Sequence, residues 1–216
     1  NPRMKAGDIV GEPLSIHGIA SGSEKKRLVA EVFERVGLRP DQMDRFPHEF
    51  SGGQRQRLSI ASALIIKPSI IIADEPVSAL DVSIQASIVN LMIRLQKEMG
   101  LSFLFISHDM SVVEHISHRV AVMYLGRIVE LAERPALFSA PQHPYTEALL
   151  SAVPVPDPKV ARKKRTILTG EIPSPINPPS GCHFHTRCPI AETRCGQQAP
   201  VLKQARPGHW VACHLR

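Results

Sequence analysis

Two carboxylates, Asp74 and Glu75, stand directly after the short aliphatic run Ile70–Ala73. A continuous apolar run of this length is typical of a parallel strand that is covered on both faces. In open α/β sheets, ligands bind outside the carboxyl ends of such strands. The pattern therefore predicts that the two carboxylates lie at a ligand site.

A second group of residues, Ser51-Gly52-Gly53-Gln54, precedes this strand. Ser51 is a favourable N-cap, and the two glycines allow a backbone to come close to a ligand. The helix that follows would direct its free amide groups at whatever lies before Ser51, which suits a phosphate. Pro68 ends this helix.

Further elements are expected around these residues. Asp81 is predicted to cap a long helix that runs to Met99 and is ended by Gly100. Leu101–Ile106 is expected to be a second buried strand, with His108 just beyond its end and so beside the ligand site. The apolar stripe of the long helix is assigned to the core and consists of Ile84, Ile88, Leu91, Met92 and Leu95.

The flanking segments predict smaller units. Val10 to Ile19 is expected to be loop with a short helix, and helices are predicted from Ser23 to Val36 and from Asp41 to Pro47. A hairpin is predicted from Val120 to Leu131 around Leu125-Gly126, followed by a short helix over 135–139.

In order and spacing, these segments resemble the ATPases of ABC transporters. Residues 51–54 resemble the signature loop, and Ile70 to Glu75 resembles Walker B with its catalytic glutamate. Ser78 to Asp81 resembles the D-loop, and His108 stands where the H-loop histidine is found. The resemblance implies an α/β fold, a P-loop NTPase-like nucleotide-binding domain with a helical subdomain.

The resemblance also implies roles across a dimer, in which two subunits close head to tail around two ATP molecules. Ser51, Gly52 and Gly53 would contact the γ-phosphate of an ATP held by the partner, and Gln54 would support that loop. Asp81 would reach across the dimer and link the two sites.

The remaining roles that the resemblance implies concern hydrolysis. Asp74 would hold the water shell of Mg2+, and Glu75 would act as general base or orient the attacking water. His108 would contact the γ-phosphate. One residue departs from the family pattern, because Ser62 stands where an arginine is usual.

The chain contains no G-x-x-x-x-G-K-[ST] loop that could wrap the phosphates of a nucleotide. We therefore expect a fragment that lacks the Walker A half of the domain and is inactive alone. A complete but degenerate protein is the alternative.

Three divisions of the chain are expected. Residues 1–68 would form the helical and signature subdomain, residues 69–140 the rest of the ATPase core, and residues 141–216 a loop-rich extension.

The extension resembles that of oligopeptide and dipeptide importer ATPases, in particular the F-type subunit, most closely from His143 to Leu150 and from Gly170 to Cys182. The resemblance implies ATP-driven peptide import at the cytoplasmic face of the inner membrane, as a peripheral subunit. The implied partners are a second ATPase subunit (D-type or identical), two transmembrane permeases and, indirectly, an extracytoplasmic peptide-binding protein.

The four cysteines all lie in this extension, at Cys182, Cys188, Cys195 and Cys213. Four thiolates can hold Zn2+ or a [4Fe–4S] cluster. The irregular spacing, without Cys-x2-Cys knuckles, and the family relation both favour the cluster; zinc and unligated buried thiols are the alternatives. Neighbouring histidines that could substitute as ligands are His183, His185, His209 and His214.

Two other functions compete with peptide import. The net charge of +6 comes from mixed charges and does not by itself indicate nucleic acid, and the basic cluster over 162–165 is expected to be a solvated face. No apolar run reaches the roughly 20 residues of a membrane span. The alternatives are a soluble ABC ATPase that acts on nucleic acid and a non-enzymatic metal-binding fragment.

Overall fold

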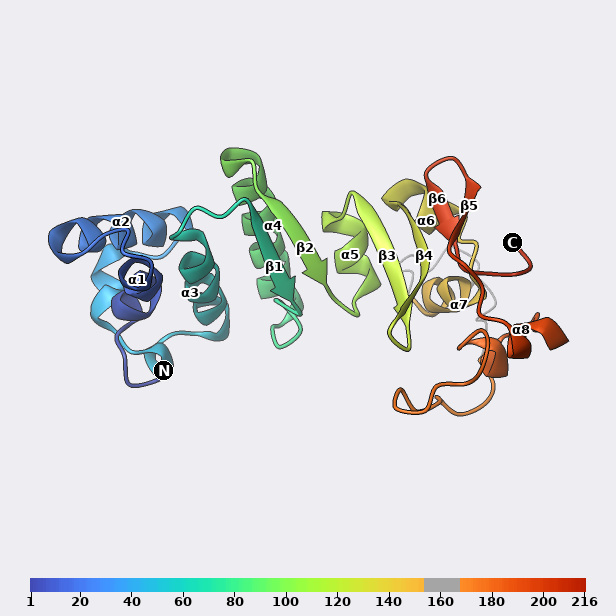
Figure 1. Ribbon diagram of the computed structural model, residues 1–216. Coiled ribbons are helices and arrows are strands. Elements are labelled where there is room, and N and C mark those ends of the chain that lie inside the picture. Colours follow the sequence, from blue (N-terminus) through green and yellow to red (C-terminus); the bar gives the residue numbers. More distant parts are fainter. Residues whose placement is uncertain (154–167) are drawn as a thin grey trace. The chain divides into compact units, whose positions relative to one another are not determined.

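The computed structural model describes residues 1–153 and 168–216, which form two compact units, 1–109 and 110–216 (Figure 1). The basic cluster at 162–165 lies outside the described residues. The division of the chain at residues 68 and 140 does not coincide with the two units and stays a prediction.

The first unit begins with helices that pack on one another. The segment expected to be loop with a short helix lies largely in an 11-residue helix, α1, which begins earlier than predicted and has Pro13 inside it. This helix forms because Ala6, Val10 and Leu14 recur at helical spacing and are fully buried. The helical elements of this part are α1 (Ala6–Ile16), α2 (Gly22–Arg35), two 3-10 turns (Pro40–Asp44 and Pro47–Glu49) and α3 (Gly52–Leu64).

Two arginines join these helices to the next one, α4 (Val82–Met99). Arg57 of α3 donates to the carbonyl of Val36, just after α2, and to Ser87 Oγ of α4 at 2.9 Å. Arg94 of α4 donates to the carbonyl of Arg35 at 2.9 Å. Carbonyls at the end of α2 therefore gain the donors that a helix C-terminus lacks.

The two predicted strands pair in parallel, β1 (Ile70–Asp74) with β2 (Ser102–Ile106), and α4 runs along one face of the pair (Figure 1). The expectation that both strands are covered on both faces is wrong. Ala73 is buried, but one face of the pair is exposed, with 56% of Ile70 and 67% of Ile72 accessible. Leu104 and Ile106 of β2 extend this exposed apolar face.

Helix α4 begins and ends as predicted. Asp81 accepts a hydrogen bond from the Ile84 amide at 3.0 Å, and Gly100 ends the helix at φ 64, where glycine is favoured. Most of its apolar stripe is buried, namely Ile88, Leu91, Met92 and Leu95. Ile84 is the exception, since 36% of it is exposed.

The second unit contains an antiparallel sheet of order β3-β4-β6-β5. The predicted hairpin is confirmed as β3 (Arg119–Tyr124) and β4 (Arg127–Glu133). The extension is less loop-rich than expected, because β6 (His209–Val211) pairs with β4 and β5 (Lys203–Arg206) pairs with β6. The other elements are α5 (Met110–Ile116), α6 (Arg134–Ser139), α7 (Pro144–Ala152), a 3-10 turn (His185–Arg187) and α8 (Thr193–Gln197).

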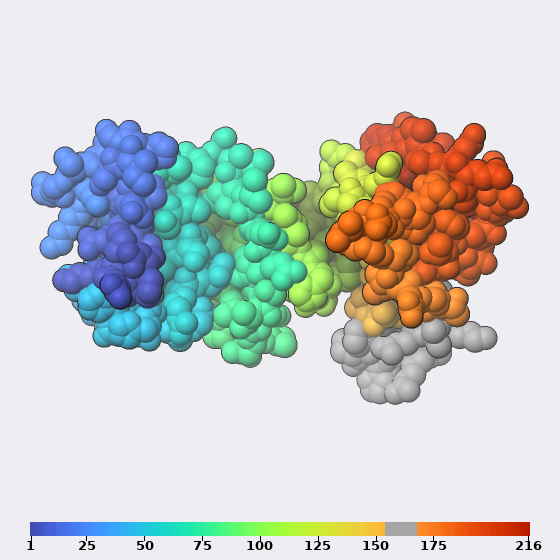
Figure 2. Space-filling view, turned by 60° about the horizontal axis from the view of Figure 1, so that its bottom comes forward, coloured from blue at the N-terminus to red at the C-terminus, as the bar shows by residue number. Residues whose placement is uncertain are grey.

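An aromatic cluster forms the core of this unit. The ring of Phe184 lies 5.2 Å from that of Tyr124, 5.4 Å from that of Tyr145 and 5.6 Å from that of His143. Phe184 comes from the extension and Tyr124 from the hairpin, so the extension packs into the same core as the sheet. Figure 2 shows the surface of the extension, in orange and red, as one continuous body.

Within the described parts of the chain, no helix has the length and apolar character needed to span a bilayer.

Candidate functional site

The structure brings Glu75 and His108 into direct contact. Glu75 follows β1, and its amide donates to the carbonyl of Ile106, the last residue of β2, at 2.9 Å. His108 stands two residues further along, and its Nδ1 lies 3.0 Å from Glu75 Oε1. The hydrogen bond and charge of His108 hold the pKa of the Glu75 carboxyl below its ordinary value.

The backbone of Glu75 is unusual, with φ at 44, in the left-handed region that non-glycine residues rarely adopt. Such conformations persist where the surroundings impose them, and they cluster at functional sites. Here two hydrogen bonds hold the residue: one from the Glu75 amide to the Ile106 carbonyl, and one between the Glu75 and His108 side chains. Asp74, the last residue of β1, is exposed at the same end of the strand pair.

Ser51 begins α3 as predicted, through a reciprocal capping box. Ser51 Oγ accepts from the Gln54 amide at 3.3 Å, and Gln54 Oε1 accepts from the Ser51 amide at 3.0 Å. Gln54 therefore holds Ser51 in place. Ser51 and Gly52 are exposed, so the start of α3 is open to a ligand, whereas Gly53 is buried.

The segment between Glu75 and α4 is held by local hydrogen bonds. Ser78 Oγ donates to the Glu75 carbonyl at 3.1 Å, and Gln85 Nε2 of α4 donates to the Val77 carbonyl at 3.0 Å. Asp81 at its end serves as the cap of α4. These bonds link the carboxylate at the strand end to the first turn of α4.

Two features of this region were not predicted. The side chains of Leu80 and Ile84 lie against the glycines at the start of α3, and a Cβ on Gly53 would meet Ile84 Cγ2 at 2.6 Å. No pattern in the sequence signals these contacts, which join two helices distant in the chain.

The second unit holds a buried polar cluster that was also missed. Glu130 is fully buried, and its carboxylate accepts from His209 Nε2 at 2.6 Å, the Gln142 amide at 2.7 Å and the His143 amide at 2.9 Å. The available signal was a glutamate inside an apolar strand, since such a residue is almost never buried without partners.

All four predicted cysteine ligands lie in the extension of the second unit. The Cys182 amide donates to the Cys195 carbonyl at 2.7 Å, and Gly181 approaches the same carbonyl so closely that a Cβ would lie 2.4 Å from it. Burial raises the pKa of the Cys182 and Cys188 thiols, and the charges of Cys195 and Cys213 raise both further.

The histidines that flank the thiols each have a ring nitrogen in another contact. His209 meets Glu130, and the ring nitrogens of the other three lie near backbone oxygens: His183 near Leu125, His185 near Cys182 and His214 near Gln198. These contacts occupy one nitrogen of every candidate substitute ligand.

A single metal ion has no support. Within residues 1–153 and 168–216, no set of three or more histidine, cysteine, aspartate or glutamate side chains is arranged to hold one. The donors of a zinc ion must converge at about 2.0–2.3 Å from one point.

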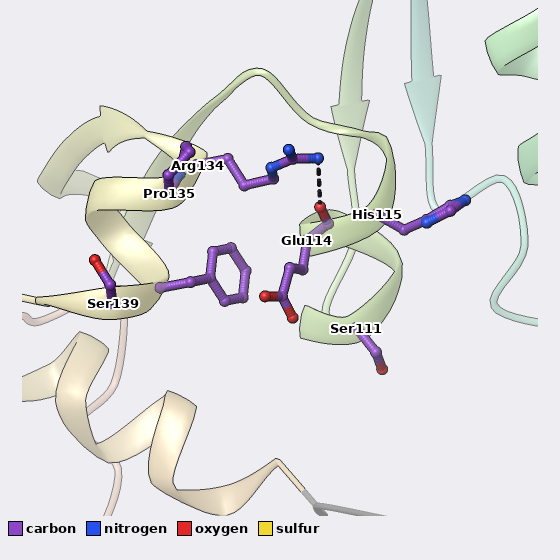
Figure 3. A pocket seen from close by; sticks show the side chains of 7 residues that line it. Ser111, Glu114, His115, Arg134, Pro135 and Ser139 are labelled. Carbon is purple, nitrogen blue, oxygen red and sulfur yellow. Dashed lines mark hydrogen bonds between the residues drawn. The ribbon is translucent and has the colours of Figure 1, made fainter.

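A surface pocket of about 670 Å3 lies between α5 and α6 and includes no predicted site residue. Figure 3 shows the side chain of Arg134, at the start of α6, reaching toward Glu114 of α5, and Phe138 of α6 also lines the pocket. Arg134 Nη1 donates to the Glu114 carbonyl at 3.2 Å, which bridges the two helices.

Comparison with known families assigns both ends of the chain. Residues 1–78 match the ABC transporter family, and residues 129–195 match the family described as oligopeptide/dipeptide transporter, C-terminal region.

Individual relatives match along the whole chain. The oligopeptide transport ATP-binding proteins AppF and YkfD of Bacillus subtilis are each 56% identical to it, over 216 and 217 residues. These matches take in 100% of this chain but 66% of each relative, so the chain spans about two thirds of their length. A Brucella ovis protein named for peptide import and ATP binding is 57% identical over 213 residues, 99% of this chain and 67% of that protein. The chain therefore belongs to the family of ATP-binding proteins of oligopeptide and dipeptide ABC transporters.

Proposed function

We propose that the complete protein hydrolyses ATP, with Glu75 as general base and His108 as its partner. The observation that carries this proposal is the 3.0 Å contact between Glu75 Oε1 and His108 Nδ1 at the carboxyl ends of β1 and β2. The lowered pKa keeps the Glu75 carboxylate ionised, so that it can accept a hydrogen bond from the attacking water and orient it. Asp74, one residue earlier, would hold the water shell of Mg2+.

The start of α3 would bind the γ-phosphate of an ATP that a second subunit holds. Ser51 and Gly52 are exposed there, and the first amides of a helix lack intrahelical partners and attract anions. This chain has no G-x-x-x-x-G-K-[ST] loop, so the other phosphates of the ATP would be bound by residues that are not part of this chain. Asp81, at the head of α4, would face the second subunit.

The work driven by this hydrolysis would be peptide import. Relatives that match the whole chain are named for oligopeptide transport and peptide import, and the extension matches the oligopeptide/dipeptide transporter region. The partners would be a second ATP-binding subunit, identical or paralogous, and two permeases at the cytoplasmic face of the inner membrane. A peptide-binding protein on the other side would supply the substrate. The relatives do not favour action on nucleic acid.

The direct test is Glu75→Gln in the complete protein, assembled with its permeases. The amide keeps the size of the side chain but cannot accept the proton, so we expect ATP turnover to fall by about 100-fold or more. Steady-state phosphate release measures it, and tight nucleotide binding should persist.

Glu98→Gln is the matched control, because Glu98 is an exposed glutamate that meets Arg94 at 3.5 Å on the surface of α4. Turnover of this variant should equal that of the unaltered protein. Turnover by Glu75→Gln at the control's level would remove the general-base assignment.

We further propose that the four thiols of the extension hold an iron–sulfur cluster. A cluster fits better than zinc because its ligands bind separate irons and need not converge on one point. Bound iron would keep the thiols deprotonated, against the burial that raises the pKa of Cys182 and Cys188. The ligands would be Cys182, Cys188, Cys195 and Cys213. The cluster would cross-link these parts of the extension and so stabilise its fold.

Anaerobic purification with iron, acid-labile sulfide and zinc analysis tests this proposal. We expect about four irons and four sulfides per chain. Stoichiometric zinc without sulfide, or no metal at all, would overturn it.

A further inference from the structure

The two glycines at the start of α3 need an explanation that the backbone does not provide. Neither Gly52 nor Gly53 has a positive φ, so any residue could adopt their conformations. Glycine also weakens a helix relative to alanine. Something beside the helix must therefore exclude a side chain, either a ligand or another part of the protein.

The structure supplies a neighbour for each glycine. A Cβ on Gly53 would lie 2.6 Å from Ile84 Cγ2, and one on Gly52 would lie 3.3 Å from Leu80 Cδ2. The first distance is far shorter than a carbon–carbon contact, whose optimum is about 3.5–4.0 Å. Gly53 is also buried, so its Cα side faces Ile84 rather than solvent.

Ile84 cannot move aside easily. Its amide is held by the Asp81 carboxylate at 3.0 Å, and a β-branched side chain in a helix has one strongly preferred χ1 rotamer. The preceding turn is held in addition by Gln85, which donates to the Val77 carbonyl at 3.0 Å. The backbone that carries Ile84 is therefore held in place by hydrogen bonds at the first turn of α4.

This backbone is continuous with the predicted general base. Ser78 Oγ donates to the Glu75 carbonyl, and the chain then passes through Leu80 and the Asp81 cap to Ile84. The start of α3 therefore rests on the segment that begins at Glu75.

We infer that Ile84 is a positioning residue. Its Cγ2 methyl packs against Gly53 and thereby sets where the amides of residues 51–54 lie relative to Glu75. In the proposed dimer these two groups serve different ATP molecules, so the contact couples the two nucleotide sites through one subunit. The inference rests on the proposed function for its kinetic consequence, whereas the contact itself is independent of that function.

The test is a double-mutant cycle in the complete protein. Gly53→Ala adds the methyl that would clash, and Ile84→Ala removes its partner. Ile84→Val is the matched control, because valine keeps both γ carbons on Cβ and removes only the terminal methyl. Each change is made singly and with Gly53→Ala, and the cycle is measured by thermal unfolding without nucleotide and by the kcat and KM for ATP.

We expect Gly53→Ala to lower the midpoint of unfolding by roughly 2–6 °C and kcat by about tenfold or more, since overpacking displaces the start of α3. Adding Ile84→Ala should restore kcat to within about threefold of the Ile84→Ala single variant. Adding Ile84→Val should restore neither measurement.

Two results would overturn the inference. If kcat of the Gly53→Ala, Ile84→Ala protein stays as low as that of Gly53→Ala, glycine is required at position 53 because a ligand comes close to it, and not because it packs against Ile84. If the unfolding midpoints are additive across the cycle, the contact is absent. Failure of the proposed function is distinguishable, because the unaltered protein would then show no ATP turnover while the unfolding cycle would still report the contact.

Discussion

Glu75 and His108 are separated by 33 positions in the chain, yet one hydrogen bond joins their side chains. Parallel pairing of β1 with β2 explains this contact, because it brings the carboxyl ends of the two strands to the same edge. The bond favours the ionised form of Glu75, so its contribution is present above the ordinary glutamate pKa and is lost as pH falls through the lowered one. Both side chains are exposed, so the effect is local.

At this scale we predict that His108→Ala raises the pKa of the Glu75 carboxyl toward its ordinary value. The reason is that His108 supplies both the largest and the second-largest cause of the lowered pKa. Carbon-detected NMR titration of the glutamate side chains measures the shift. His115→Ala, which removes an exposed histidine of α5, should leave that pKa unchanged. An unaltered Glu75 titration in His108→Ala would mean that the contact does not form in solution.

At the scale of elements, the carboxylate of Glu130 joins three parts of the second unit. It stands on β4 and accepts from His209 of β6 and from two amides that lead into α7. A fully buried carboxylate is tolerated only when such donors surround it. The attachment of the extension to the hairpin therefore depends on this group as well as on the aromatic core.

We predict that Glu130→Gln destabilises the second unit by about 3–5 kcal/mol, because the new amide group faces a donor and leaves buried groups unpaired. Denaturant unfolding followed by circular dichroism measures the loss. Glu133→Gln on the exposed end of the same strand is the control, with an expected change within about 0.5 kcal/mol. Equal stability of the two variants would show that Glu130 is not the anchor of the extension.

Across the unit as a whole, His143 should govern stability in mild acid. Burial lowers its pKa from 6.5 to about 4, against the opposing charge of Glu130. Between these two pH values His143 binds a proton in the unfolded chain but not in the folded chain. The free energy of unfolding therefore falls as pH drops from 6.5 toward 4. A difference of this size corresponds to roughly 3 kcal/mol in full.

We therefore predict that His143→Asn flattens the pH dependence of unfolding between pH 6.5 and 4. Asparagine does not titrate there, and it can still cap α7 in place of His143 Nδ1, which accepts from the Tyr145 amide at 3.1 Å. Unfolding midpoints over this pH range measure the slope. The same slope in His143→Asn and the unaltered protein would assign the acid sensitivity to other groups.

Much of the local structure could be predicted from single residues. Ser51 and Asp81 cap their helices, Gly100 ends one, and Leu125-Gly126 turns the hairpin. These predictions succeeded because capping and turns depend on a few neighbouring residues. The helix over this part of the chain is longer than predicted, because the helical spacing of Ala6, Val10 and Leu14 outweighs Pro13.

The candidate site could be predicted only in part. The residue types and their order pointed to Glu75 and His108, and the structure brings them together, but their catalytic roles stay predictions. The exposed apolar face of β1 and β2 could not be foreseen, since an aliphatic run does not say how many faces are covered. The pairing of β6 with β4 was not predicted, since a strand of only three residues is too short to show a periodic pattern.

The sequence by itself determined the family, the helix caps and the residues that could do chemistry, because these depend on residue type and on spacing along the chain. Only the tertiary structure decided that His108 contacts Glu75, that His209 contacts Glu130 and that Ile84 excludes a side chain from Gly53. Each of these contacts joins segments far apart in the chain. Their formation depends on strand register and helix packing, which a local pattern does not contain.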